Sequence, residues 1–63
     1  MARFYDTVSD ADLSRVEDLL DKVGIEYSLR ILGEGNLVKE IMVAEEDLSA
    51  AEEALYGRTE ANN

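Results

Sequence analysis

The sequence predicts a single α+β domain with the element order β-α-β-β-α, and three observations support this prediction. Segments 2–8, 25–32 and 37–44 have the β-branched, aromatic or alternating apolar residues that are typical of strands. Segments 10–23 and about 45–56 place apolar residues at helical spacing. The chain has 63 residues, which suffices for one domain at most.

The first expected strand, residues 2–8, would have two alternating faces, because successive side chains of a strand point to opposite sides. One face would carry Phe4 and Val8, and the other would carry Arg3, Tyr5 and Thr7. Tyr5 is then expected on an accessible surface, as an interface residue with an apolar ring and a polar hydroxyl.

The segment 10–23 is predicted to be an amphipathic helix, with one apolar stripe formed by Leu13, Val16, Leu20 and Val23. Ser9 or Asp10 can cap its N-terminus, and Ser9 followed by Asp12 imitates a capping box. Gly24 follows the last apolar residue and fits the position just beyond the helix C-terminus.

The second and third strands are predicted to form an antiparallel hairpin. The residues of the second strand expected to face the helices are Ile25, Tyr27, Leu29 and Ile31. A three-residue loop, 34–36, places Arg30 opposite Glu40, whereas a two-residue loop would place it opposite Lys39, a like-charge pair. We therefore expect the three-residue loop.

The second helix is expected to begin at three acids, because the N-terminus of a helix carries partial positive charge: Glu45, Glu46 and Asp47. Residues 1–57 would form the domain, and the polar residues 58–63 would be a disordered tail. We expect a ferredoxin-like fold without its last strand, with a mixed or antiparallel three-stranded sheet of order 1-3-2 and both helices on one face.

The composition excludes several classes of function. The chain has 15 acidic and 6 basic residues and a net charge of −9, so direct binding to nucleic acid or to an anionic membrane is not expected. It contains neither Cys nor His, which removes disulfides, thiolate metal sites and the usual general base. We expect neither a metal nor another cofactor.

Carboxylates are the only abundant groups with catalytic potential, and most are expected on solvent-facing helix surfaces. The chain is therefore predicted not to be an enzyme. Four acids have part of the spacing of an EF-hand loop: Asp6, Asp10, Asp12 and Glu17. Val8 and Ala11 occupy positions where that motif needs an oxygen ligand and a glycine, so no calcium site is expected.

The sheet face turned away from the helices is the best candidate for function. Aliphatic residues ringed by charge often mark a protein contact, although a small sheet also simply exposes some aliphatic side chains. The free edge of the first strand can pair with another chain, unless Arg3 and Asp6 discourage such pairing. The predicted partner-binding residues are Arg3, Tyr5, Arg30, Leu32, Val38, Glu40 and Met42.

Three stretches resemble a known family: an Arg-Phe-Tyr strand before an acidic cap, LLDKVGIEYSLR at 19–30, and IMVAEEDLSAAEEALYG at 41–57. Over about 3–57, the chain resembles the small bacterial proteins described as "putative prokaryotic signal-transducing proteins". The resemblance implies a βαββα fold distantly like PII regulatory proteins, and a binding or signalling role. The family often has Pro where this chain has Ala44, and usually a longer hairpin.

We therefore predict a regulatory or signal-transducing protein-interaction module, forming a homodimer through the open sheet face or the edge of the first strand. Three alternatives remain: an acidic inhibitor or nucleic-acid mimic that binds a basic cleft, an accessory subunit of a larger enzyme, and a small-molecule sensor of the kind that the PII-like resemblance implies. The cytoplasm is the expected location, because the N-terminus lacks the apolar run of a signal peptide and no stretch approaches a membrane span.

Overall fold

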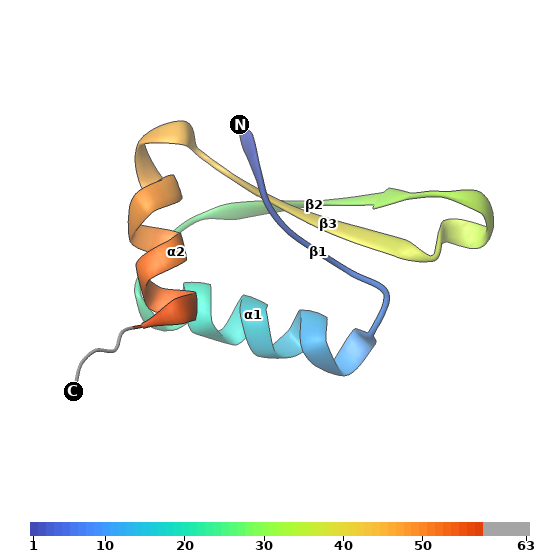
Figure 1. Ribbon diagram of the computed structural model, residues 1–63, viewed down its shortest axis with the longest axis horizontal. Helices are drawn as coiled ribbons and strands as arrows, with labels where there is room; N and C mark the ends of the chain where they lie inside the picture. Colours follow the sequence, from blue (N-terminus) through green and yellow to red (C-terminus); the bar gives the residue numbers. More distant parts are fainter. Residues whose placement is uncertain (58–63) are drawn as a thin grey trace.

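The computed structural model describes residues 1–57, and the predicted tail, 58–63, lies outside the described residues. The predicted element order is confirmed (Figure 1). The strands and helices are β1 (Ala2–Thr7), α1 (Asp10–Lys22), β2 (Tyr27–Leu32), β3 (Val38–Val43) and α2 (Leu48–Tyr56). Two short 3-10 turns, η1 (Glu34–Asn36) and η2 (Glu45–Asp47), precede β3 and α2.

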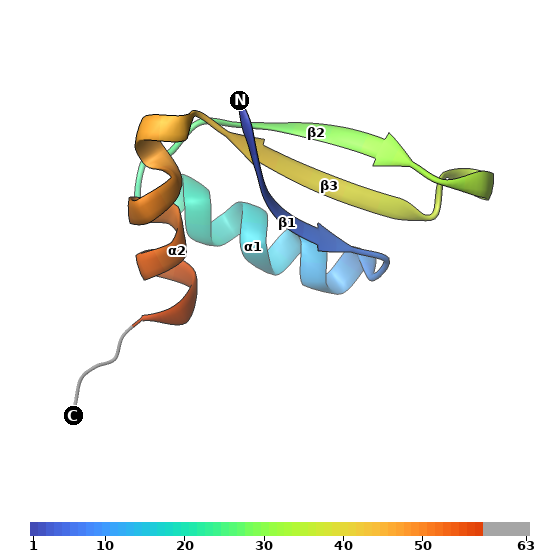
Figure 2. The same ribbon diagram turned by 45° about the horizontal axis from the view of Figure 1, so that its top comes forward.

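The sheet has the predicted order β1-β3-β2, and both neighbouring pairs are antiparallel. Both helices lie on one side of it, with α1 running beneath the strands and α2 standing at the end where β3 finishes (Figure 2). The other side of the sheet is left open. This is the ferredoxin-like arrangement expected from the sequence.

The hairpin has the register of the three-residue loop. Arg30 is paired with Glu40, and the same register joins Tyr27 to Val43 and Leu32 to Val38. The chain turns through η1, where Gly33 and Gly35 have φ values of 84° and 71°. Glycine adopts such positive φ values without a steric penalty, which explains its place on both sides of Glu34.

The alternation expected for the first strand is wrong beyond Arg3. Arg3 is paired with Met42, but Tyr5 is paired with Ile41, so Phe4 is an additional residue that forms a β-bulge. The bulge allows Phe4 and Tyr5 to pack against the same core. Tyr5 thus lies on the helix side of the sheet, instead of sharing a face with Arg3.

The ends of α1 are defined by local hydrogen bonds. At the start, the Ser9 hydroxyl accepts a hydrogen bond from the Asp12 amide at 3.1 Å, which confirms Ser9 as the N-cap. At the end, the Gly24 amide donates to the Asp21 carbonyl and the Ile25 amide to the Leu20 carbonyl. These two bonds, with Gly24 at a φ of 75°, form a Schellman motif.

The core lies between the sheet and the two helices. Its fully buried residues come from α1, β3 and α2: Val16, Leu20, Ile41, Val43 and Ala51. Leu29 and Ile31 lie on the helix side of β2, as predicted, but they are 44% and 43% exposed. β2 is the outermost strand, and the two helices leave these side chains partly in solvent. The loop end of the hairpin extends past both helices (Figure 1). Val23 was expected in the buried stripe and is instead exposed at the helix C-cap.

Candidate functional site: the open sheet face

The open sheet face brings together six of the seven residues predicted to bind a partner. Cross-strand pairing aligns Arg3 with Met42, Arg30 with Glu40, and Leu32 with Val38. Residues that are directly paired in a sheet point to the same side, and Ile41 between them points into the core. Tyr5 is the exception, because the bulge turns it to the opposite side.

Glu40 is the centre of this face, and it is only 2% exposed although no helix lies above it. Arg30 donates to Oε1 of Glu40 through Nε at 2.9 Å, and its Nη2 lies 2.6 Å from the same oxygen. Nη1 of Arg3 lies 3.7 Å from Oε2. A carboxylate removed from water needs such countercharges, so the two arginines make its burial possible.

The two arginines themselves remain accessible. The side chains of Arg3 and Arg30 are 66% and 59% exposed. Arg3 also lies 3.7 Å from Asp6. A guanidinium group has five N–H donors, and only some of these face Glu40 and Asp6. The centre of the open face therefore presents cationic donors on a chain whose net charge is −9.

Aliphatic side chains lie next to this charged centre. Leu32 is exposed, and Val38 and Met42 are half-buried. The structure adds Met1, which sequence reasoning missed: the Ser28 hydroxyl donates to Sδ of Met1 at 3.2 Å. Since Ser28 is paired with Met42, Met1 extends the apolar part of the face. A residue before the first strand carries no local signal that would have revealed this contact.

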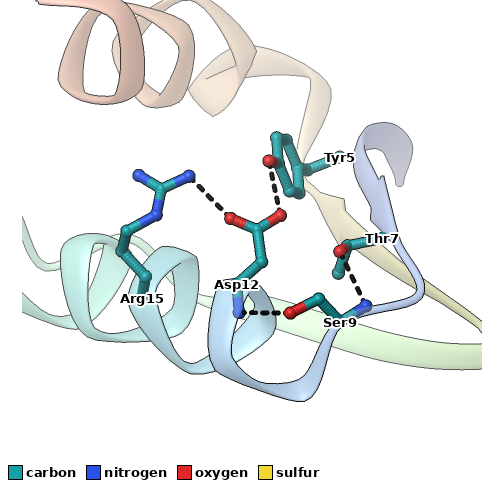
Figure 3. A network of polar contacts seen from close by, with 5 residues as sticks. All are labelled: Tyr5, Thr7, Ser9, Asp12 and Arg15. Carbon is teal, nitrogen blue, oxygen red and sulfur yellow. Dashed lines mark hydrogen bonds and ion pairs between the residues drawn. The ribbon is translucent and has the colours of Figure 1, made fainter.

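A second polar cluster joins β1 to α1 on the helix side of the sheet (Figure 3). The Tyr5 hydroxyl donates to Oδ2 of Asp12 at 2.7 Å, and Nη2 of Arg15 donates to Oδ1 at 2.7 Å. The predicted capping box is only half formed, because the Asp12 carboxylate makes these contacts. The Ser9 amide instead donates to Oγ1 of Thr7.

These contacts shift the ionisation of both Tyr5 and Asp12. The hydrogen bonds from Tyr5 and then Arg15 lower the pKa of Asp12 below the usual aspartate range. The hydrogen bond to Asp12, together with desolvation, raises the pKa of Tyr5 above that of a free tyrosine. Asp12 is thus held as an anion and Tyr5 as a neutral donor. The cluster ties the first strand to the first helix.

A shallow hollow of about 480 Å³ lies where α1 leads into β2, lined by Asp21, Gly24, Ile25, Glu26 and Tyr27. Burial first, and then the charges of Glu17, Asp21 and Asp18, raise the pKa of Tyr27. Within residues 1–57, no three acidic side chains are grouped so that they could hold a metal ion. Over the same residues, no helix has the length and apolar character needed to cross a membrane.

The fold and the open face together define a small α+β domain of ferredoxin-like topology whose accessible sheet surface mixes aliphatic and cationic groups. The chain belongs to the family described as "Putative prokaryotic signal transducing protein", which it matches over residues 1–57. The resemblance seen in the sequence is thereby confirmed. No curated protein and no solved structure matches the chain.

Proposed function

We propose that this chain is a non-catalytic regulatory or signal-transducing domain that acts by binding another protein through its open sheet face. The observation that carries this proposal is the clustering of exposed Arg3 and Arg30 around buried Glu40, beside exposed Leu32. Arginine and methionine are enriched at protein interfaces, and an arginine held in place by a buried carboxylate loses little conformational freedom on binding. The family description supports a signalling role.

The chemistry of the face defines the kind of partner. Its aliphatic residues favour apolar side chains, and its guanidinium groups favour carbonyl or carboxylate oxygens. We further propose a cytoplasmic location and self-association, with the open face or the edge of β1 as the surfaces predicted from the sequence. No catalytic role is proposed, because the central carboxylate, Glu40, is already paired with two cations.

The test compares two lysine substitutions that change the net charge equally. Met42→Lys alters the open face, whereas Ser14→Lys alters an exposed position on α1. Tagged proteins are used to capture partners from a bacterial lysate, the captured protein is identified, and its affinity is measured by calorimetry. We expect Met42→Lys to abolish capture and Ser14→Lys to preserve it. Equal affinity of both variants, with both folded by circular dichroism, would remove the open face from the proposal.

The acidic surface favours a second candidate function, that of an inhibitor or mimic which occupies a basic cleft. Exposed acids lie on both helices, which cover the side of the sheet opposite the open face, and include Asp18 and Asp21 on α1 and Glu52 and Glu53 on α2. Such binding would weaken steeply as salt rises, because exposed charges are screened. Binding through the open face would depend much less on salt. The salt dependence of the measured affinity therefore separates the two candidates.

A further inference from the structure

The outer edge of β2 is an accessible strand edge with apolar side chains on both of its faces. Five of its six residues are exposed, and among residues 1–57 no other strand pairs with this edge. Leu29 and Ile31 are exposed on the helix side, and Leu32 is exposed on the open face. Backbone donors and acceptors in such an edge are available to pair with another strand.

The two edges of the sheet differ in regularity. β1 contains the bulge at Phe4, and its exposed Arg3 and Asp6 are charged, two features that protect an edge from pairing. β2 instead pairs with β3 through six consecutive residues without a shift in register. An extended, unbulged strand is the better surface for adding a strand, so β2 is better suited to pairing than β1.

We propose that a second copy of this chain pairs with the outer edge of β2, antiparallel and with Ser28 opposite Ser28. This rests on the self-association proposed above and assigns it to β2, an edge that was not among the surfaces predicted from the sequence, with Arg30 at the border between this edge and the open face. In this register Glu26, which directly precedes β2, would lie opposite the second copy's Arg30, and the symmetry makes this pair twice. Opposite charges in directly paired positions stabilise a sheet. The charged row Asp6–Glu40–Arg30 of one copy would then continue into an acid of the other.

The apolar positions fit the same register. Tyr27 would lie opposite the second copy's Leu29. The second copy's Ile31 would come close to Ile25, which precedes β2 and packs against the core. The hollow lined in part by Ile25 and Tyr27 lies next to the positions that these incoming side chains would take. Covering Leu29 and Ile31 would remove from water two aliphatic side chains on the helix side of β2 that α1 and α2 leave partly exposed.

Charge selects this register over its neighbours. Centring the pairing on Arg30 would place Arg30 opposite itself, a destabilising like-charge pair. Centring it on Leu29 would place Glu26 opposite Leu32 and would leave Arg30 opposite Ser28. Of these three registers, only the one centred on Ser28 places both Glu26 and Arg30 opposite a residue of opposite charge. The result is a six-stranded sheet. The open faces of both copies lie on the same side of it, because directly paired residues of two strands point to the same side.

The register can be tested by cross-linking, because the chain contains no cysteine. In the proposed dimer the two Ser28 Cα atoms would be about 4.5–5.5 Å apart, within the range of a disulfide. Single-cysteine variants Ser28→Cys, Leu29→Cys and Ser14→Cys, which keep Glu26 and Arg30, are oxidised at equal concentration and examined on non-reducing gels. We expect a covalent dimer to form fastest with Ser28→Cys. Faster cross-linking of Leu29→Cys, or equal rates for all three, would overturn the proposed register.

The dimer itself is tested without cysteine, by analytical ultracentrifugation in about 0.15 M salt, which screens the repulsion between two acidic copies. We expect the chain to dimerise and Glu26→Arg to raise the dissociation constant by about tenfold, since it places two like charges opposite each other. Glu53→Arg, on exposed α2, changes the net charge equally and should have little effect.

A strictly monomeric chain would refute both pairing through β2 and the proposed self-association. A dimer weakened equally by both substitutions would refute pairing through β2 alone. Neither result would bear on the binding of another protein through the open face. The Met42→Lys comparison tests that function separately, so the two proposals can fail independently.

Discussion

Arg30 and Glu40 face each other across the β2–β3 hairpin, with Nη2 of the arginine 2.6 Å from Oε1 of the glutamate. This pair has two consequences for the molecule. It sets the hairpin register, since any shift by one residue would separate the charges. It also allows a carboxylate to be buried on a sheet face that no helix covers, because Arg3 approaches the second oxygen.

Replacing Glu40 should destabilise the fold measurably. Glu40→Ala removes the acceptor of the Arg30 hydrogen bond and the partner of Arg3. Because the two arginines are exposed and can be rehydrated, we expect a loss of about 1–3 kcal/mol in the free energy of unfolding, measured with urea. Glu46→Ala, at an exposed position, is the control and should change stability by less than about 0.5 kcal/mol. Equal effects of the two substitutions would contradict the role of Glu40.

Tyr5→Phe should destabilise the protein at neutral pH and less in acid. The Tyr5 hydroxyl lowers the pKa of Asp12, so Asp12 contributes stability above its unfolded pKa of about 3.9. That contribution is lost as the pH falls through the lower, folded pKa. The difference in the free energy of unfolding between wild type and Tyr5→Phe should therefore narrow as the pH falls below about 3.9.

The measurement is urea unfolding across this range, together with an NMR titration of the Asp12 carboxyl. In the Tyr5→Phe variant, the pKa of Asp12 should move up toward the usual value. The control is Tyr56→Phe, because Tyr56 is largely exposed. If the free energies of unfolding of wild type and Tyr5→Phe differed by the same amount at every pH, the Tyr5–Asp12 hydrogen bond would not be the cause.

Alkaline titration should reveal the two protected tyrosines. The bond to Asp12 raises the pKa of Tyr5, and burial together with neighbouring acids raises the pKa of Tyr27. In the folded chain, tyrosinate absorbance should therefore rise at higher pH than in the chain unfolded with urea. Because both neutral forms are favoured by folding, stability should fall as the pH rises above about 10. Removing either tyrosine should reduce the late-titrating fraction, and coincident folded and unfolded curves would be inconsistent with these environments.

Gly24→Ala should destabilise the protein through the backbone alone. Gly24 has a φ of 75°, and a Cβ atom added there would meet no atom within 4 Å. The cost is therefore the left-handed conformation itself, about 1–2 kcal/mol for a residue with a side chain. Gly24→Asn should cost less, because asparagine adopts this conformation more readily. Thermal unfolding followed by circular dichroism ranks the stability of wild type, Gly24→Asn and Gly24→Ala, expected to decrease in that order. An alanine variant as stable as wild type would contradict this expectation.

The sequence by itself determined the element order, the helix caps and the hairpin register, because each depends on residues close together along the chain. Ser9 and Gly24 mark the ends of α1 by their own hydrogen-bonding and backbone preferences. The charges of Arg30 and Glu40 select one loop length. Since side chains alternate along a regular strand, the same reasoning placed six residues of the candidate site on one face.

The tertiary structure decided what local patterns do not encode. The bulge at Phe4 turns Tyr5 from the open face to the core, because packing both rings against the core outweighs regular alternation. Leu29 and Ile31 follow the pattern of buried residues, yet they are exposed, because the helices are too few and too short to cover the outermost strand. Burial depends on which elements meet in space, and that is settled by contacts between segments distant in the chain.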